Sequence, residues 1–385
     1  MSRKELTVLV VIVLAQFMCT SLWFAGNAVL PQLVTSLSLT AENLGWMTSS
    51  VQFGFIVGTL IYAFLTIADK FNASNVFLIS ALLGAAANAL ITLQSAYLGI
   101  LFFRFLTGLF LAGIYPVGMK IASDHFAKGL GKAMSFLVGA LVLGTALPHL
   151  IASLDSSLDW RKVLHATSIL AITGGLLIKL FVGEGPFKKI GQKPRFADMA
   201  SVFKRKEFRG AAFGYFGHMW ELYAFWAFVP VILRASKSFQ NSSEETISLW
   251  SFVVIALGAL SCFAGGYLSE KFGTKKMAGF FLLSSGVCCL LSPLVFGLGK
   301  ILFLAFVIFW GLVVIADSPL FSTLVAQNAN PEIKGTALTL VTSIGFAITI
   351  FSIQLLSYLG NVLDERYLYL ILLAGPLFGL AALKK

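Results

Sequence analysis

Three charged side chains, Arg104, Glu221 and Asp317, lie well inside apolar runs that are long enough to cross a membrane. A charge at the centre of a bilayer costs about 2.5 to 3.5 kcal/mol on insertion scales, so such residues usually serve a function. Helical rise puts Glu221 roughly 17 Å from the start of its run, Arg104 roughly 10 Å from the end of its own, and Asp317 roughly 24 Å into its run. In hydrocarbon about 30 Å thick, the depths of Arg104 and Glu221 agree to within a helical turn.

The chemistry of the first pair suggests solute binding coupled to proton transfer. Arg104 is expected to bind an anionic group of a solute or to hold a carboxylate, while Glu221 takes up and releases a proton. Burial favours the neutral form of a carboxyl group and a nearby cation favours its charged form, so movement of the solute or of Arg104 would switch its protonation state. The alternative is that Arg104 is a conformational latch, hydrogen-bonded to helix backbone.

His218 precedes Glu221 by one helical turn, so the two side chains share a face and can touch. An imidazole titrates near neutral pH, which suits a proton relay. Equally, His218 satisfies a backbone carbonyl. The His-x-x-Glu spacing also fits a metal, but no third ligand lies at matching depth. We therefore predict neither a metal nor another cofactor.

Aromatic and amide side chains near these charges complete the candidate set. Each is explained as well by packing or by a hydrogen bond between helices as by contact with a solute. They are Trp220 and Tyr223 beside Glu221, Trp23 and Asn27 in the first apolar run, and Tyr115 in the fourth.

Composition defines the elements that must position these groups. The 385 residues are 58% hydrophobic and 12% charged, against roughly 25% charge in a soluble domain, and the mean hydropathy is +0.89. The sequence therefore predicts an all-α polytopic membrane protein in contact with a lipid bilayer. The four cysteines all fall inside apolar runs, where packing is the expected role.

Polar, Gly and Pro breaks divide the apolar residues into twelve runs of membrane-spanning length. The predicted spans are Thr7–Leu30, Leu44–Ile67, Val76–Leu93, Tyr97–Met119, Ala133–Ala152, Val163–Val182, Gly210–Leu233, Ile247–Leu268, Met277–Leu298, Ile301–Val325, Thr336–Leu359 and Tyr367–Leu383.

Charge fixes the orientation. With the N-terminus inside, 21 of the 28 Lys and Arg residues fall on the cytoplasmic side and six on the other, as the positive-inside rule requires. This distribution, rather than nucleic-acid binding, accounts for the net charge of +11. We predict a multi-pass protein of the cell inner (plasma) membrane with both termini cytoplasmic.

The polar stretch from residue 184 to 209 separates two apolar halves that echo each other. It contains eight Lys and Arg residues together with Pro and Gly, which excludes it from hydrocarbon. The predicted organisation is a six-helix bundle at 1–183, a cytoplasmic linker at 184–209 and a second six-helix bundle at 210–385. Gly108 and Pro116 recur as Gly311 and Pro319 at an offset of 203, which indicates duplicated, pseudo-symmetric bundles facing a central cavity.

Over nearly its whole length the chain resembles twelve-helix transporters of the major facilitator superfamily. Its Gly-x-Leu-x-Asp loop is matched by residues 266–276, with Glu in place of Asp, and its Arg-x-x-x-Gly signature by Arg104 and Gly108. The first copy of the loop keeps Asp69 but lacks the usual glycines and basic residues. The resemblance implies a monomer whose first, fourth, seventh and tenth helices line the cavity. It also implies gating residues, namely Asp69, Glu270, Lys271, Gly273 and Lys275.

The function predicted is secondary active transport of a small, anionic solute by alternating access, coupled to protons. No Walker-type nucleotide loop occurs, which argues against ATP drive. The alternative is proton-coupled efflux of lipophilic or drug-like compounds. An enzyme would need a clustered nucleophile or metal set, and a receptor would need a sizeable soluble domain, and the sequence indicates neither.

Overall fold

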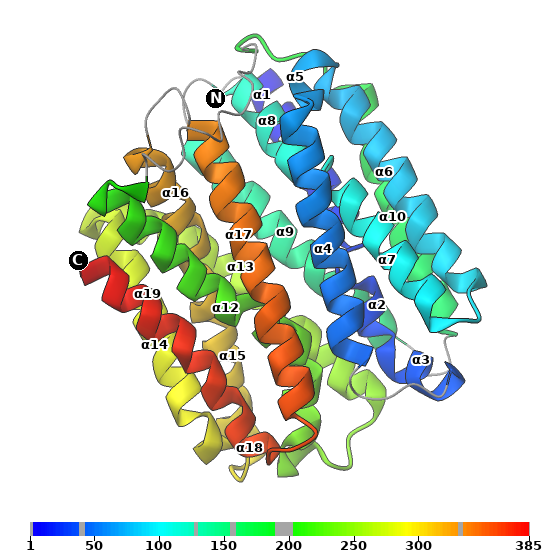
Figure 1. Ribbon diagram of the computed structural model, residues 1–385. Coiled ribbons are helices and arrows are strands. Elements are labelled where there is room, and N and C mark those ends of the chain that lie inside the picture. The colour runs from blue at the N-terminus through cyan, green and yellow to red at the C-terminus, as the bar shows by residue number, and fades with distance from the viewer. Residues whose placement is uncertain are drawn as a thin grey trace. The chain divides into compact units, whose positions relative to one another are not determined.

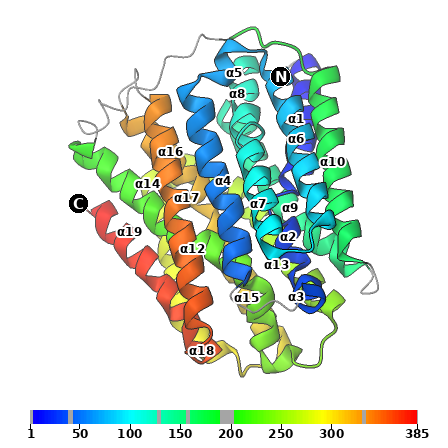
Figure 2. The ribbon, with the colours of Figure 1, turned by 45° about the vertical axis from the view of Figure 1, so that its right-hand side comes forward.

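The computed structural model of the protein describes residues 3–37, 43–126, 130–154, 159–188, 203–329 and 334–384. The chain divides into two compact units, Met1–Lys193 and Pro194–Lys385, here called the N-terminal and the C-terminal unit. Figures 1 and 2 show that the described parts of both are built of helices, with no strand among them.

The described part of the N-terminal unit combines long helices with several that are interrupted or short. Its elements are α1 (Arg3–Thr20), α2 (Ala25–Ala28), α3 (Leu30–Leu37), α4 (Asn43–Phe64), α5 (Ile67–Lys70), α6 (Ala73–Leu90), the 3₁₀ turn η1 (Ile91–Leu93), α7 (Tyr97–Leu111), α8 (Tyr115–His125), α9 (Leu130–Ser153) and α10 (Trp160–Phe181). Within it α4 packs against α7, α6 against α10, and α1 against α9 and α10.

The C-terminal unit repeats this pattern around one central helix. Its elements are α12 (Lys206–Ala235), η3 (Lys237–Phe239), α13 (Glu244–Phe272), α14 (Thr274–Val295), α15 (Lys300–Ala316), α16 (Ser318–Asn328), α17 (Lys334–Leu359), α18 (Glu365–Leu368), η5 (Tyr369–Leu373) and α19 (Ala374–Lys384). Helix α12 runs between α17 and α19 (Figures 1 and 2) and also packs against α13 and α16.

Eleven helical segments in the described residues are long and apolar enough to cross a membrane, and the shorter apolar helix at residues 5–20 precedes them. The predicted all-α polytopic fold is thus confirmed. Helix α12 begins at Lys206 rather than at Gly210, so part of the predicted linker is helical. Most of the rest of the linker lies outside the described residues.

The fourth and tenth predicted spans are interrupted at matching places. In the fourth, α7 ends at Leu111 and α8 begins with Tyr115-Pro116; in the tenth, α15 ends at Ala316 and α16 begins with Ser318-Pro319. Proline removes a backbone donor and its ring clashes with the preceding turn, which ends each first segment and suits the start of the next. The matching breaks give the two halves the same backbone pattern.

The first predicted span breaks without a proline. Hydroxyl groups compete for the backbone carbonyls there: Thr20 donates to the carbonyl of Gln16 at 2.8 Å and Ser21 to that of Met18 at 2.6 Å. Such local bonds offer the chain an alternative to the helical ladder. A turn over residues 21–24 follows, and α2 starts at Ala25.

Glycine sets the spacing of the helix pair that carries Arg104. A side chain at Gly108 on α7 would run into the backbone carbonyl of Val51 on α4, and one at Gly54 on α4 into that of Phe105. Gly311, the predicted counterpart of Gly108, packs in the same way on the carbonyl of Val254. Small residues at these positions let two helices approach closely.

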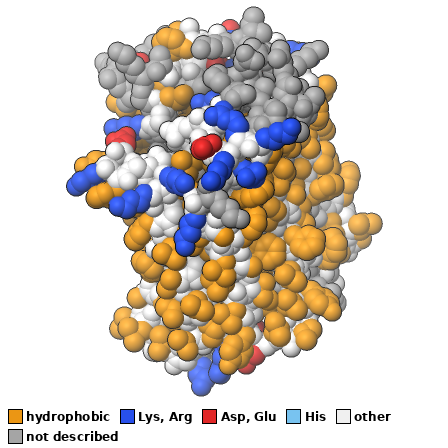
Figure 3. Space-filling model, turned by 60° about the vertical axis from the view of Figure 1, so that its left-hand side comes forward, with side chains coloured by type: hydrophobic (Ala, Val, Ile, Leu, Met, Phe, Trp, Pro, Cys, Tyr) orange, Lys and Arg blue, Asp and Glu red, His pale blue; other side chains and the backbone are white. Residues whose placement is uncertain are grey.

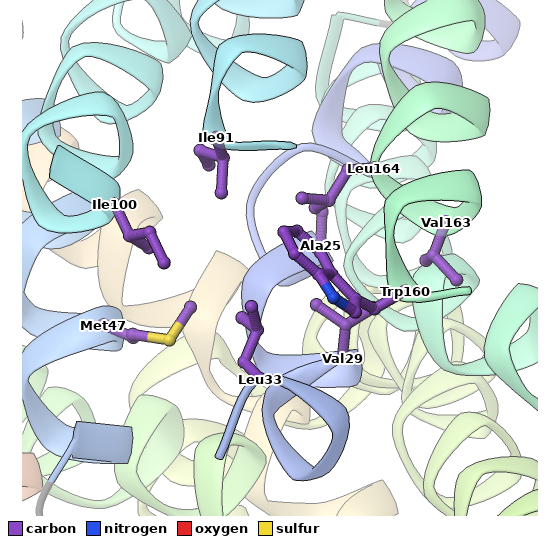
Figure 4. Close-up of a cluster of buried hydrophobic side chains, with 9 residues drawn as sticks. All are labelled: Ala25, Val29, Leu33, Met47, Ile91, Ile100, Trp160, Val163 and Leu164. Carbon is purple, nitrogen blue, oxygen red and sulfur yellow. The ribbon is translucent and has the colours of Figure 1, made fainter. Parts of the chain in front are cut away.

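A buried apolar cluster holds α2 and α3 in place at one end of the N-terminal unit. Its side chains come from α2, α3, the residue between them, α4, η1, α7 and α10. Figure 4 shows them: Ala25, Val29, Leu33, Met47, Ile91, Ile100, Trp160, Val163 and Leu164. Because this packing fixes α2, it also fixes the turn before α2, where the side chain of Arg104 ends.

Candidate functional site

Glu221 and His218 both lie on α12, and each side chain is only 1% exposed. Helix α12 is thirty residues long and is covered on most sides by its neighbours. Buried polar groups require hydrogen-bond partners. The partners of these two residues therefore show what the site is built to hold.

The carboxylate of Glu221 accepts three hydrogen bonds from α14 and α15. The indole Nε1 of Trp310 lies 2.7 Å and the Sγ of Cys289 3.3 Å from Oε1, while the Oγ of Ser285 lies 2.9 Å from Oε2. All three donors are buried and uncharged. No Lys, Arg or His side chain in the described residues lies within ion-pairing distance of Glu221.

Ser285 can serve either protonation state of Glu221. Its hydroxyl group has one hydrogen but two acceptors in reach, Oε2 of Glu221 at 2.9 Å and the carbonyl of Leu282 at 3.1 Å. When Glu221 is ionised, the hydroxyl donates to it. When Glu221 is protonated, its own O–H can donate to Ser285, whose hydrogen then turns to Leu282.

His218 pairs with Asp317 rather than with Glu221. Its Nδ1 lies 2.8 Å from Oδ1 of Asp317, and Asp317, like His218, is 1% exposed. Asp317 stands at the N-terminal end of α16, where the helix dipole favours a negative charge. Nε2 of His218 is buried with no hydrogen-bond partner among the described residues.

The expected contact between His218 and Glu221 is therefore wrong. Their three-residue spacing puts both on one stretch of α12, but each side chain reaches a different neighbouring helix. Within the described residues, no group of three or more His, Cys, Asp or Glu side chains is arranged to hold a metal.

The two aromatic candidates on α12 have different surroundings. Tyr223 packs against Trp226 and Phe346, with ring centroids 5.3 and 5.1 Å away. Trp220 donates from Nε1 to the carbonyl of Ile371 at 3.1 Å and lines an apolar cavity beside α19. Both therefore contribute to packing within the unit.

Arg104 in the N-terminal unit is wholly buried and bonded to backbone. Its Nη1 donates to the carbonyl of Leu22 at 3.0 Å and its Nη2 to that of Trp23. Both carbonyls belong to the turn between α1 and α2. These contacts match the latch alternative. No carboxylate in the described residues lies within ion-pairing distance of Arg104, and its Nε has no hydrogen-bond partner there.

Other polar candidates surround the same turn. Asn27 on α2 donates to Thr48 on α4 at 2.7 Å, and the ring of Trp23 lies 4.7 Å from that of Phe55. Tyr115, the first residue of α8, is half-buried. One turn beyond Thr48, the buried amide of Gln52 has no hydrogen-bond partner among the described residues.

The two predicted gating loops differ. In the N-terminal unit, Lys120 on α8 lies 3.5 Å from Asp69 on α5 and 2.7 Å from Asp124. In the C-terminal unit, Glu270, Lys271 and Lys275 are exposed and form no ion pair with any described residue. Gly273 between them has a φ of +91°, which a residue with a side chain rarely adopts.

The start of the predicted linker folds back onto the N-terminal unit. The backbone N–H of Phe187 donates to the carbonyl of Asp124 at 2.9 Å, and Asn72 donates to Glu184 at 3.3 Å. The hydrogen bond that Lys188 donates to Glu184 lowers the pKa of this carboxyl group below its ordinary value, and the positive charge of Lys188 adds to the effect. Residues 182–188 are thus tied to α8 and to the start of α6.

Sequence reasoning missed Ser285, Cys289 and Trp310, the three donors to Glu221. The position of Cys289 in an apolar run indicates packing, and the sequence around Ser285 gives no sign of a special role. One signal was available: Trp310 directly precedes Gly311, which marks a close helix contact. A donor-only indole beside such a contact implies a buried acceptor nearby.

Comparison with known proteins agrees with this architecture. A family model described as Major Facilitator Superfamily matches residues 12–383. The chain belongs to this superfamily.

Three relatives have sequences similar to this chain. The Cj0987c protein of Campylobacter jejuni is 26% identical over 271 residues, which are 70% of this chain and 82% of that protein. The MFS-type transporter YcaD of Salmonella enteritidis is 23% identical over 253 residues, 64% of this chain and 62% of that protein. Human solute carrier family 22 member 2 is 30% identical over 130 residues, 30% of this chain and 23% of that protein. The last two matches span less than two thirds of those relatives.

Solved transporters share the fold of this superfamily member. The xylose transporter XylE from E. coli superposes with a TM-score of 0.78 at 15% identity, over 99% of this chain and 97% of that one. A bacterial homologue of the human lysosomal transporter Spinster, in an inward-facing and unoccupied conformation, superposes with a TM-score of 0.74 at 15% identity. The match covers 100% of this chain and 96% of that one. At these identities the likeness concerns the fold. The match to the superfamily model, together with the apolar helices, makes the protein a multi-pass secondary transporter.

Proposed function

We propose that this transporter moves a small anionic solute together with protons, and that Glu221 is the group that binds and releases the proton. The observation that carries the proposal is the set of contacts around Glu221. The acid is buried, its donors are uncharged, and one of them, Ser285, can turn its hydrogen away when the acid is protonated. A site of this kind tolerates both charge states.

The His218–Asp317 pair supplies a second titratable position in the same unit. Its imidazole can hold a proton between Asp317 on one nitrogen and an open position at Nε2. We assign it the role of relay towards Glu221 through an intervening water molecule.

The proposal that the solute is anionic rests on Arg104. Its charge is buried, two of its N–H groups are used by backbone carbonyls, and no described carboxylate neutralises it. A buried cation without a counterion attracts a negative group. In this proposal Arg104 combines both of the roles considered from the sequence, since it anchors the turn at Leu22 and Trp23 and supplies the positive charge.

The alternative, lipophilic efflux, drew on the aromatic residues of α12. Tyr223 and Trp226 are almost fully buried against neighbouring side chains of their own unit. They are therefore occupied in packing, which favours the anionic solute.

Membrane placement and gating complete the proposal. We place the protein in the cell inner membrane with both termini in the cytoplasm, working as a monomer by alternating access. Asp69 paired with Lys120, and the loop carrying Glu270, Lys271, Gly273 and Lys275, would serve as gating elements on the cytoplasmic side.

The function can be tested by measuring the internal pH of proteoliposomes with an enclosed pH dye. Purified protein is challenged with a panel of organic and inorganic anions, neutral sugars and cationic dyes. We expect a pH change with one class of anion, lost in Glu221→Gln and retained in Glu365→Gln, an exposed acid on α18. A pH change driven only by the cationic dyes would support lipophilic efflux. Anion uptake with no proton movement at any pH would exclude the coupling.

A further inference from the structure

One outer face of the C-terminal unit combines a basic end with a long apolar surface. Figure 3, in which the left side of Figure 1 is turned forward, shows Lys and Arg side chains gathered near one end and hydrophobic side chains over most of the rest. Helix α19 lies on this side in Figure 1.

A cavity of about 520 Å³ opens between α12, α17 and α19 on this unit. Its lining is apolar, and it includes the exposed rings of Phe351 (72% exposed) and Phe378 (51% exposed). Gly217 and Gly375 line it where α12 and α19 approach closely, since a side chain at either glycine would run into the backbone carbonyl of the other. Trp220, whose indole is bonded to the carbonyl of Ile371, stands in its wall.

The hollow continues towards the basic end. Phe378 also lines a second cavity of about 380 Å³, whose wall contains Lys206 and Arg209. Lys206 in turn lines a third cavity of about 200 Å³ together with Lys275. The Phe213 ring bridges the first two, 5.9 Å from Phe216 and 5.5 Å from Phe378.

The three basic side chains at this end of the groove have no acidic partner among the described residues. Lys206, Arg209 and Lys275 are exposed, and none forms an ion pair with a described residue. Glu207 is the one acidic residue that lines these cavities. The basic end therefore keeps a net positive charge available to a ligand.

The length of the groove matches one leaflet of a bilayer. From Arg209 to Trp220 the helix rises about 17 Å, and half of a hydrocarbon core is about 15 Å. With Arg209 at the level of the head groups, the apolar cavity spans the acyl-chain region of a single leaflet. A ligand with an anionic head and an apolar chain of that length fits both ends at once.

We infer that this groove is a binding site for an anionic phospholipid. The phosphate head contacts Lys206, Arg209 and Lys275, and one acyl chain lies along Phe213 and Phe378 into the cavity beside Trp220. Basic side chains at the membrane surface favour anionic lipids by about fivefold for each charge. Neutral lipids would fill the apolar part but would gain nothing at the basic end.

Native mass spectrometry of the whole protein, released from vesicles of equal phosphatidylglycerol and phosphatidylcholine, tests the site. We expect retained phosphatidylglycerol to exceed phosphatidylcholine at least about tenfold. The triple variant Lys206→Gln, Arg209→Gln, Lys275→Gln should retain the two lipids equally. A control triple of exposed lysines that line none of these cavities, Lys132→Gln, Lys237→Gln and Lys300→Gln, should keep the preference.

A second variant separates lipid from free phosphate. Ala347→Phe narrows the apolar cavity without touching the cations, and it should lower retention of phosphatidylglycerol several-fold. If glycerol phosphate or inorganic phosphate displaces the lipid completely, or if Ala347→Phe has no effect, the site binds a phosphate group alone. Equal retention of both lipids by the unmodified protein would overturn the inference.

Discussion

The N-terminal and C-terminal units place their deepest charges in opposite kinds of surroundings. In the first, Arg104 donates to the backbone carbonyls of Leu22 and Trp23. In the second, Glu221 accepts from side chains of three different types, each neutral. The backbones are alike, since Gly108 and Gly311 make the same close helix contact, but the charges are not repeated.

The difference shows how one fold can separate a fixed charge from a variable one. Guanidinium is not deprotonated in proteins, and carbonyls can only accept, so the surroundings of Arg104 suit one state. The surroundings of Glu221 suit two, because Ser285 can donate to it or accept from it. At the offset of 203 that relates Gly108 to Gly311, Arg104 corresponds to Val307, an apolar residue. In our proposal, the proton is therefore carried by the C-terminal unit.

Removing the variable charge should have the largest effect. In Glu221→Gln we expect solute-driven proton movement to be abolished, while exchange of solute between the two sides of the membrane continues, because the amide imitates only the protonated acid. Proteoliposome counterflow and the internal pH dye measure the two separately. If Glu221→Gln moved protons at the wild-type rate, the two units would not differ in the way described.

Altering the fixed charge should reduce transport of every solute. Arg104→Lys keeps the charge but loses the planar fork that reaches two carbonyls, and each such charge-assisted bond is worth about 1.5 to 3 kcal/mol. We expect transport to fall by tenfold or more and the melting temperature to drop. Arg104→Gln should in addition raise the apparent KM for the anion. An Arg104→Lys protein with normal melting and normal transport would contradict the anchoring role.

Removing one donor should shift the pH dependence rather than abolish transport. Trp310 stabilises the ionised form of Glu221, so Trp310→Phe favours the protonated form, and release of the proton then requires a higher pH. A hydrogen bond to a charged acceptor is worth about 1.5 to 3 kcal/mol. Its loss should therefore move the alkaline limb of the plot of transport rate against pH up by about one to two pH units. Trp46→Phe, at an exposed position on α4, is the control. A downward shift would mean that Trp310 does not serve the ionised acid.

The smallest effect is expected at Ser285. Ser285→Ala removes a hydroxyl group that serves both states, as donor to the ionised acid and as acceptor from the protonated one. The alkaline limb of the pH profile should therefore move up by less than about one pH unit. Ser292→Ala is a matched control, since this buried hydroxyl on the same helix donates only to the carbonyl of Cys289 at 2.8 Å. Equal pH profiles for the two variants would show that Ser285 does not respond to the charge on Glu221.

The helices could be predicted from the sequence because hydrophobic run length is a local property. The breaks at Pro116 and Pro319 coincide with the repeated prolines. The break after Thr20 was missed because no proline or glycine marks it. It depends on hydroxyl groups that bond to the preceding turn and on Arg104, which lies far away in the sequence.

The partners of the charges could not be predicted because they depend on which helices touch. His218 and Glu221 are near neighbours on α12, and spacing alone favoured a contact between them. The packing of α16 brings Asp317 to His218, while α14 and α15 bring Ser285 and Trp310 to Glu221. Small serines and cysteines inside apolar runs give no sign of the acid that they will contact.

Infrared difference spectroscopy tests the central claim most directly. Spectra of the transporter in lipid are recorded as the pH is raised across the range in which transport is lost, for the wild type, Glu221→Gln and Asp317→Asn. We predict that a protonated carboxyl band disappears in the wild type, that it is missing in Glu221→Gln, and that it persists as a titrating band in Asp317→Asn. A band that survives in Glu221→Gln and vanishes in Asp317→Asn would place the proton on Asp317 and contradict the account.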